Sequence, residues 1–220
     1  GALMSEPKMF GVTERELIHE FVGLNHFHWH RVFDQNGKNI TADIIEKMYS
    51  EDAGLPANIH ATNFLRDQLD QMQLIPCGYH RYYYLQEEML KHGLEEYNTI
   101  GTRAQQVRQT EAELFELYKD PALDYKPEQL TKRGGTHYSD AACECINSIY
   151  NDKRTHMVVS TQNNGACPDL APDSIIEVSS IIGARGAQAI AFGELESAEK
   201  GWLQVMKAME ECTIKAAITG

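Results

Sequence analysis

Three histidines occupy alternate positions in the segment GLNHFHWH at residues 23–30: His26, His28 and His30. Neutral imidazole is a good ligand for first-row transition metals, so this spacing points to a metal site. In an extended strand the three side chains share one face, but successive ones lie about 7 Å apart. At most one or two can therefore reach the same ion. The alternative is a set of polar histidines on a half-exposed strand, and no HExxH or paired CxxC motif decides between the two.

A cluster of aromatic residues follows in the segment GYHRYYYL at residues 78–85. Its four tyrosines are Tyr79, Tyr82, Tyr83 and Tyr84. A phenol is a weak base near neutral pH unless a cation lowers its pKa, and a metal, Arg81 or Arg133 could provide that charge. The cluster is therefore either a source of a general base or ordinary aromatic packing with hydroxyl groups at the surface.

Two polar loops have the residue types that bind sugars and phosphates. In TKRGGTHYSDAA, residues 131–142, adjacent glycines allow close backbone approach and Arg133 offers a forked guanidinium to an anion. Ser139 and the helix start expected there add hydrogen-bond donors. In TQNNG, residues 161–165, the amide of Asn163 suits sugar hydroxyls. The alternatives are an ordinary turn with a helix cap in the first segment and a plain turn in the second.

Composition excludes several classes of protein. The chain has 220 residues and a formal net charge of −12, which gives it no electrostatic reason to bind nucleic acid. It has no apolar run long enough to span a membrane and no secretory signal at its start, so we expect no membrane partner. The five cysteines form no disulfide framework spacing, which favours a reducing, cytoplasmic location.

Hydrophobic periodicity predicts the elements that hold these segments. A short helix over residues 12–19 is expected to pass into an extended segment at 20–34. Helices are expected at 41–51, 61–75, 78–93 with Gly93 as the C-cap, 102–120, 139–152 with Ser139 as the N-cap, and 196–220. Strands are expected at 156–165, 174–183 and 186–195. Long helices with clustered strands indicate an α+β fold rather than a repeating βαβ pattern.

Taken in order, the segments GLNHFHWH, GYHRYYYL, LTKRGGTHYSDAAC, INSIYNDKRTHMVVSTQNNG and DLAPDSIIEVSS resemble glycoside hydrolase family 4, and most of all its 6-phospho-β-glucosidase branch. The resemblance covers nearly the whole chain. It implies that residues 1–220 are a single substrate- and metal-binding C-terminal domain, similar to that of lactate and malate dehydrogenases, with long helices and a small, mostly antiparallel sheet. The family's N-terminal dinucleotide-binding domain is absent, so the fragment alone is expected to be inactive.

The resemblance also implies a mechanism outside the usual pair of carboxylates. In that family NAD oxidises the sugar C3 hydroxyl, and a divalent metal, usually Mn²⁺, polarises the oxygen. A tyrosine then removes the C2 proton, the aglycone leaves by elimination, and water addition and reduction complete the cycle. The expected substrate is a phosphorylated β-glucoside, and the expected parent enzyme is a homo-oligomer.

Site residues follow from matching the family's motifs. The histidine of GLNH, a metal ligand in the family, is His26 here. The family's base lies in a Y-x-x-Y-Y segment, which gives Tyr79 first and Tyr82 second. Candidate substrate contacts are Asn25, Arg133 and Asn163.

Two departures from the family pattern limit the resemblance. The glycine-rich dinucleotide loop is not in this sequence, and neither is the family's second metal ligand, a cysteine in a CN-x-P stretch. The alternatives are a non-enzymatic phosphosugar-binding module, or a parent that is a phospho-α-glucosidase, an α-galactosidase or an α-galacturonidase.

Overall fold

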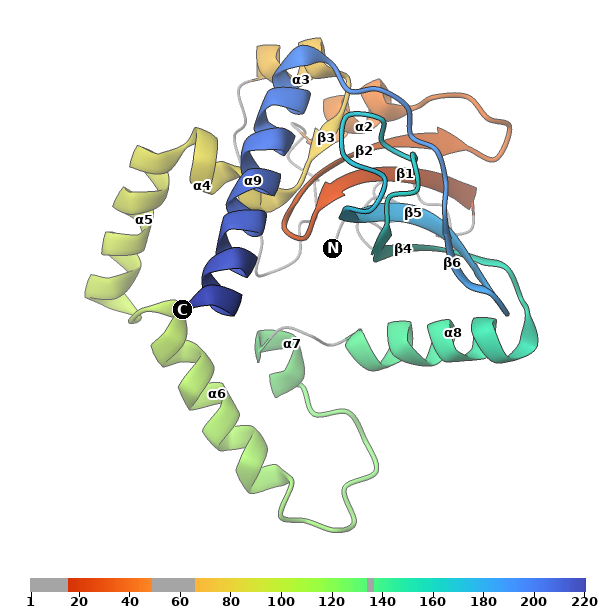
Figure 1. The fold of residues 1–220 in the computed structure, drawn as a ribbon. Helices are drawn as coiled ribbons and strands as arrows, with labels where there is room; N and C mark the ends of the chain where they lie inside the picture. The colour runs from red at the N-terminus through yellow and green to blue at the C-terminus, as the bar shows by residue number, and fades with distance from the viewer. Residues whose placement is uncertain (1–15, 49–65, 134–136) are drawn as a thin grey trace.

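The computed structural model describes residues 16–48, 66–133 and 137–220. Helices surround a small sheet in which every pairing in this part of the chain is antiparallel, which confirms the predicted α+β class (Figure 1). The elements in chain order are β1 (Leu17–Leu24), β2 (Phe27–Asp34), α2 (Thr41–Met48), α3 (Arg66–Met72), β3 (Ile75–Pro76), the 3₁₀ turn η2 (Gly78–His80), α4 (Arg81–Tyr84), α5 (Gln86–Thr99), α6 (Arg103–Leu117), α7 (Gln129–Arg133), α8 (Tyr138–Asn151), β4 (Thr155–Gln162), β5 (Ile175–Gly183), β6 (Gly186–Ala189) and α9 (Ser197–Thr219).

Strand β5 lies between β1 and β4 in the sheet and pairs with other strands along both of its edges. One edge pairs with β4 along its length. The other edge is shared, because Glu177 and Val178 pair with β1 whereas Ser180–Gly183 pairs with β6. Strand β1 pairs in turn with all of β2, and β2 pairs with the short β3. The β1–β2 hairpin is therefore held between β5 and the segment that leads into α4.

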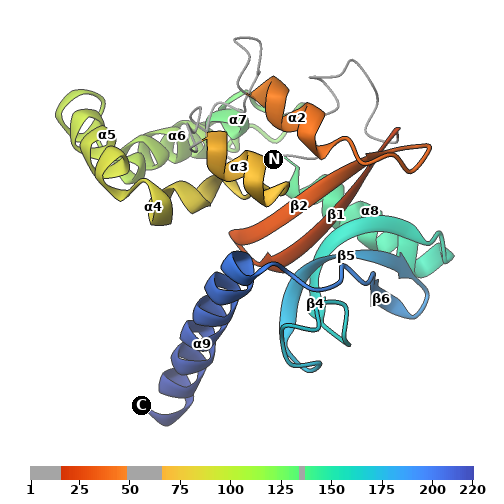
Figure 2. The ribbon, with the colours of Figure 1, turned by 90° about the horizontal axis from the view of Figure 1, so that it is seen from above.

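Alternation of side chains gives the hairpin two buried faces. On one face Val22, Leu24 and Trp29 pack into a cluster that includes Leu203 of α9. On the other face a second cluster joins the hairpin to α2 and α3; it contains Leu17, Val32, Ile44, Ile45, Leu69 and Ile75. Figure 2 shows α9 on one side of β1 and β2, with α2 and α3 on the opposite side. Burial on both faces fixes the register, since a slip by one residue would exchange the two sets of side chains.

The outer edge of β2 is occupied by short contacts from the following segments. The backbone N–H of Cys77 donates to the carbonyl oxygen of His28, at 2.8 Å. The N–H of Ile40 donates to the carbonyl of Val32 at 2.9 Å, and the Thr41 hydroxyl accepts from the N–H of Val32, also at 2.9 Å. These bonds connect both α2 and the tyrosine segment directly to the hairpin.

The helices α5 and α6 lead away from the sheet (Figure 1). A capping box begins α6: the Thr102 hydroxyl accepts from the backbone N–H of Gln105, and the Gln105 side chain accepts from the N–H of Thr102. Apolar side chains such as Leu90 and Phe115 are 65% exposed on these helices. Among the described residues, no helix is both long and apolar enough to cross a membrane.

Several sequence-based expectations about elements were wrong. The helix expected at 78–93 is divided into η2, α4 and α5, and the strand expected at 186–195 ends at Ala189. Leu17–His19 belongs to β1 and not to a helix, because these residues pair with Val32–Asp34; residues 12–15 of that expected helix lie outside the described ranges. Gly93 lies inside α5 and does not end it. The helix stops at Thr99, and Gly101 then takes the left-handed conformation with φ of 85°.

Gly23 is the glycine that the hairpin requires. Its φ is 150°, and an ideal Cβ at this position would lie well inside 3.0 Å of both the His28 backbone and the Phe27 carbonyl oxygen. No side chain fits there without moving the paired strand, so the close approach of β1 and β2 beside their connecting turn depends on this residue.

We predict that Gly23→Ala lowers the free energy of unfolding by at least about 2 kcal/mol, because the added methyl group overlaps backbone. Gly37→Ala is the matched control, since Gly37 also has a positive φ, 80°, but open space around its Cβ position. It should cost only about 1–2 kcal/mol, the strain of the left-handed conformation. Urea unfolding of both variants measures the difference, and equal losses would contradict the steric argument.

Candidate functional site at the hairpin tip

The two residues that connect β1 to β2 are Asn25 and His26, and both are exposed. His26 has φ of 64°, in the left-handed region that few non-glycine residues adopt. Strained backbone of this kind persists where the surrounding structure enforces it, and it is common at functional sites. The turn therefore presents the His26 imidazole to solvent at the end of a rigid hairpin.

Tyr79 lies against this imidazole. Pairing of Trp29 with Pro76 brings β3 alongside β2, and η2 follows two residues later. The ring centroids of His26 and Tyr79 are 4.5 Å apart, with an interplanar angle of 41°. The two residues that family resemblance assigns to the metal and the base are thus in direct contact, although 53 positions separate them in the sequence.

Arg81 and Tyr82 extend the site along α4. The Tyr82 ring is stacked near that of Tyr79, with centroids 6.3 Å apart. The residue Arg81 is only 5% exposed. Its guanidinium lies 5.1 Å from the centre of the Tyr82 ring, and its Nη2 donates to the Tyr82 hydroxyl at 3.4 Å. A buried positive charge therefore accompanies the exposed phenols.

The remaining tyrosines of the cluster are packing residues. Tyr83 and Tyr84 are half-buried, and both contact Trp202 of α9. Burial, with a further contribution from the charge of Glu199, raises the pKa of Tyr84 to about 12. A higher pKa disfavours the phenolate, so Tyr84 is unsuited to remove a proton near neutral pH. Exposure and charge thus leave Tyr79 and Tyr82 as the candidate bases.

His80 holds the tyrosine segment in place by packing against the aromatic side chains of β2. It is fully buried, stacked on Phe27 with ring centroids 4.2 Å apart and edge-on to Trp29 at 4.9 Å. Neither ring nitrogen has a hydrogen-bond partner within the described residues. Burial lowers the pKa of His80 to about 3, so the ring is neutral and fixes the position of its neighbour Tyr79 through packing.

The three histidines of the opening motif have three different environments. His26 is exposed at the tip. His28 lies on β2 with its Nδ1 3.0 Å from Oε2 of Glu177, a residue that sequence reasoning did not select. His30 is buried and stacks on Phe21 at 4.4 Å. The sequence-based limit of one or two possible ligands is compatible with these positions, and His26 is the histidine whose ring faces solvent.

Arg133 and Asn163 were predicted as substrate contacts, and the structure gives both side chains other partners. Arg133, at the end of α7, donates from Nε to Glu111 of α6 at 2.8 Å. Asn163 is fully buried, and its amide bonds the backbone of the loop that follows β4, including Nδ2 to the Cys167 carbonyl at 2.9 Å. Ser139, expected as an N-cap, lies inside α8, whose N-cap is His137.

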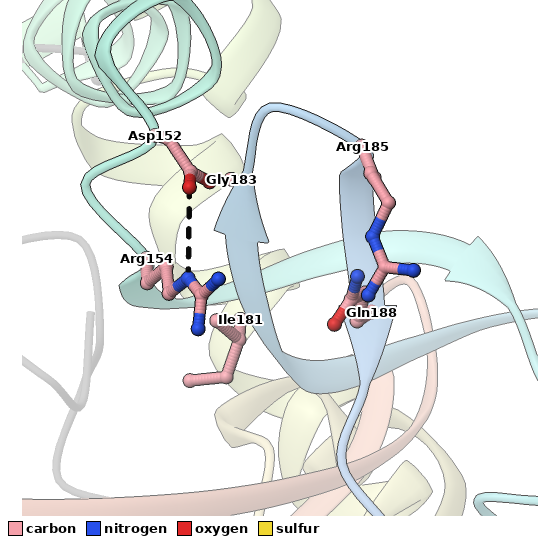
Figure 3. A pocket seen from close by; sticks show the side chains of 6 residues that line it. All are labelled: Asp152, Arg154, Ile181, Gly183, Arg185 and Gln188. Atoms are coloured by element: carbon pink, nitrogen blue, oxygen red, sulfur yellow. Dashed lines mark ion pairs between the residues drawn. The ribbon is translucent and has the colours of Figure 1, made fainter.

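A cavity of about 450 Å³ lies elsewhere on the sheet (Figure 3). It is lined by Asp152, Arg154, Ile181, Gly183, Arg185 and Gln188. Figure 3 shows Arg154 turned toward Asp152, and these two form an ion pair at 3.7 Å. Along β5 the cavity begins at Ile181, roughly 13 Å from Glu177, given about 3.3 Å for each residue of a strand. It contains none of the predicted site residues.

His26 fits the role of a single imidazole metal ligand, because it is exposed and its ring is oriented by Tyr79. In residues 16–48, 66–133 and 137–220, no three His, Cys, Asp or Glu side chains gather closely enough to hold an ion. The described residues therefore provide one candidate ligand at the tip and not a complete coordination sphere.

One known protein family matches most of this chain. Residues 21–220 match the Family 4 glycosyl hydrolase C-terminal domain. The chain belongs to glycosyl hydrolase family 4. This family membership confirms the resemblance drawn from the sequence motifs.

Relatives within family 4 cover the whole chain. It is 42% identical over 221 residues to the probable 6-phospho-β-glucosidase of Bacillus subtilis (strain 168), covering 100% of this chain and 50% of that protein. It is 35% identical to the 6-phospho-β-glucosidase of Escherichia coli (strain K12), covering 93% of this chain and 46% of that one. The chain thus spans about half the length of the relatives it matches.

A solved family 4 structure shares the fold. The 6-phospho-β-glucosidase of Thermotoga maritima, determined with manganese, NAD⁺ and glucose 6-phosphate, superimposes with a TM-score of 0.80 at 27% identity. The match covers 97% of this chain and 49% of that enzyme.

We predict that His26→Gly is more stable than His26→Ala by about 1–2 kcal/mol, the cost of holding an L-residue in the left-handed region. Both variants lose the imidazole and its contact with Tyr79, so their difference reports the left-handed backbone strain, reduced by the greater entropy that glycine loses on folding. Urea unfolding measures it. Equal stability of the two variants would show that the turn imposes no such strain.

Acid should destabilise the fold through His80. Above pH 6.5, its ordinary pKa, the ring is neutral whether the chain is folded or unfolded, so stability does not depend on it. As the pH falls from 6.5 toward 3, the unfolded chain binds a proton that the folded chain does not, and stability decreases by about 1.4 kcal/mol per pH unit. His80→Phe, which keeps a ring in the buried site, should remove this part of the pH dependence. Replacing the half-buried His92 by Gln should leave the pH dependence unchanged, and a wild-type slope in His80→Phe would refute the assignment.

Proposed function

We propose that this chain is the metal- and substrate-binding half of an NAD- and manganese-dependent 6-phospho-β-glucosidase. The observation that carries the proposal is the contact between His26 and Tyr79, with ring centroids 4.5 Å apart. These residues match the family's metal ligand and its general base. Further support comes from the Thermotoga maritima relative, whose structure contains manganese, NAD⁺ and glucose 6-phosphate.

Each residue of the site has a defined task in this proposal. When bound, the metal polarises a sugar oxygen and NAD exchanges a hydride with the sugar. His26 would hold the metal through its exposed imidazole. Tyr79, in contact with His26, removes the proton from the sugar carbon next to the polarised group. Arg81 places a positive charge beside the neighbouring phenol of Tyr82.

The proposed substrates are phosphorylated β-glucosides, because the two relatives at 42% and 35% identity are both named as 6-phospho-β-glucosidases. Asn25, exposed beside His26, is the proposed contact to the sugar. Arg133 stays a predicted contact for the sugar or its phosphate, and it would have to exchange its ion pair with Glu111 for that contact. Asn163 is not part of the proposal, because its amide is buried and bonded to backbone.

The proposal extends to the complete enzyme, by which we mean this chain preceded by a dinucleotide-binding half. That half would provide the NAD site and the remaining metal ligands. We propose that the complete enzyme is a homo-oligomer of the cytoplasm, where phosphorylated sugars are retained because a charged phosphoester does not cross a bilayer unaided.

The test compares Tyr79→Phe with Tyr82→Phe in the complete enzyme. Tyr79→Phe keeps the ring contact with His26, so KM should change little, whereas kcat should fall by about 10²–10⁴, the usual contribution of a positioned base. Exchange of the sugar C2 proton with deuterated solvent should stop in Tyr79→Phe and continue in Tyr82→Phe. The reverse pattern would make Tyr82 the base, and exchange in both variants would exclude both. Binding of the phosphosugar without turnover by the unmodified enzyme would favour a binding module instead.

A further inference from the structure

The side chains of Glu177 and His28 contact each other across strand β1, at the position of Gly23. Gly23 of β1 pairs with His28 of β2 on one side and with Glu177 of β5 on the other. Because paired residues point to the same face and Gly23 has no side chain, the two neighbours reach each other over the middle strand. The His28 Nδ1 lies 3.0 Å from Glu177 Oε2, and the side chains are only 15% and 22% exposed.

This contact lies next to both residues of the proposed site. His28 lies on β2, two positions after the turn residue His26. Its carbonyl oxygen accepts from the N–H of Cys77 at 2.8 Å, and the Cys77 carbonyl accepts from the N–H of His80 at 2.9 Å. These bonds bracket Tyr79, so the position of His28 affects the hairpin tip and the tyrosine segment together.

We propose that Glu177 and His28 form a positioning pair that holds His26 and Tyr79 in contact; this rests on the proposed function. In the tautomer with its proton on Nδ1, His28 donates this hydrogen bond to Oε2 of Glu177. This bond joins β5 to β2 at the level of the tip, where β1 offers no side chain. Neither residue is assigned to metal binding or proton transfer.

The sheet also contains an ion pair that can serve as a control, because it does not lie next to His26 and Tyr79. Arg31 of β2 donates from Nε to Glu20 of β1 at 2.7 Å, with side chains 32% and 26% exposed. It joins two strands of the same sheet on the opposite face, since Glu20 and Gly23 lie at odd spacing on β1. A general loss of strand stability should therefore appear equally when either carboxylate is removed.

The kinetic experiment uses Glu177→Ala, Glu177→Gln and Glu20→Ala in the complete enzyme with a chromogenic 6-phospho-β-glucoside and manganese. Outer partners of metal and catalytic groups typically contribute about 10–100-fold to activity, so Glu177→Ala should lose that much in kcat. Glu177→Gln should recover most of the loss, because the amide oxygen still accepts from His28. Glu20→Ala should stay within about twofold of the unmodified enzyme. Equal losses in Glu177→Ala and Glu20→Ala, or no recovery in Glu177→Gln, would overturn the proposal.

A second readout is independent of the proposed function. In the 220-residue chain, the nuclear Overhauser effect between the rings of His26 and Tyr79 reports their contact without metal, NAD or substrate. It should weaken in Glu177→Ala and persist in Glu20→Ala; persistence in both would overturn the positioning role. If Glu177→Ala does not fold, Glu177→Asp replaces it, because the shorter side chain breaks the bond and keeps the charge. A complete enzyme that hydrolyses no phosphoglucoside, with the Overhauser pattern as expected, would refute the proposed function and leave the positioning role in place.

Discussion

The close approach of β1 and β2 at Gly23 is the constraint on which the rest of the site depends. Only glycine leaves room for the paired backbone there, and the same missing side chain lets His28 reach Glu177 across the strand. Register is then fixed from both sides, because the two faces of the hairpin enter two separate hydrophobic clusters. A rigid hairpin can hold a histidine in a strained turn, which a loop would relax.

The sequence predicts most of the fold where hydrophobic pattern and local preference agree. The α+β class, the strands β4 and β5 and the terminal helix α9 follow from periodicity alone. It fails where tertiary pairing overrides local preference. Leu17–His19 resembles a helix start, yet its backbone pairs with β2. Gly93 resembles a C-cap, yet a glycine inside a helix costs only about 1 kcal/mol, and Gly101 ends the helix instead.

The candidate site was predictable only in part, because tertiary contacts that no local pattern reveals bring its residues together. His26 and Tyr79 were selected from motif resemblance, and the contact between them is a product of the β2–β3 pairing. Glu177 lies 149 residues from His28, and no local pattern reveals a contact over that separation. Asn163 shows the opposite difficulty. Its amide has the same chemistry whether it binds a sugar or closes a loop, so only its burial identifies the structural role.

The contacts along the outer edge of β2 have a consequence for association. Strand edges with free backbone groups recruit other chains by strand addition, which is also a route to aggregation. Near the tip this edge is used by β3 and Cys77, and further along by Ile40 and Thr41. An incoming strand would have to displace these bonds before it could extend the sheet. The hairpin that carries His26 is therefore protected from β-augmentation along this edge.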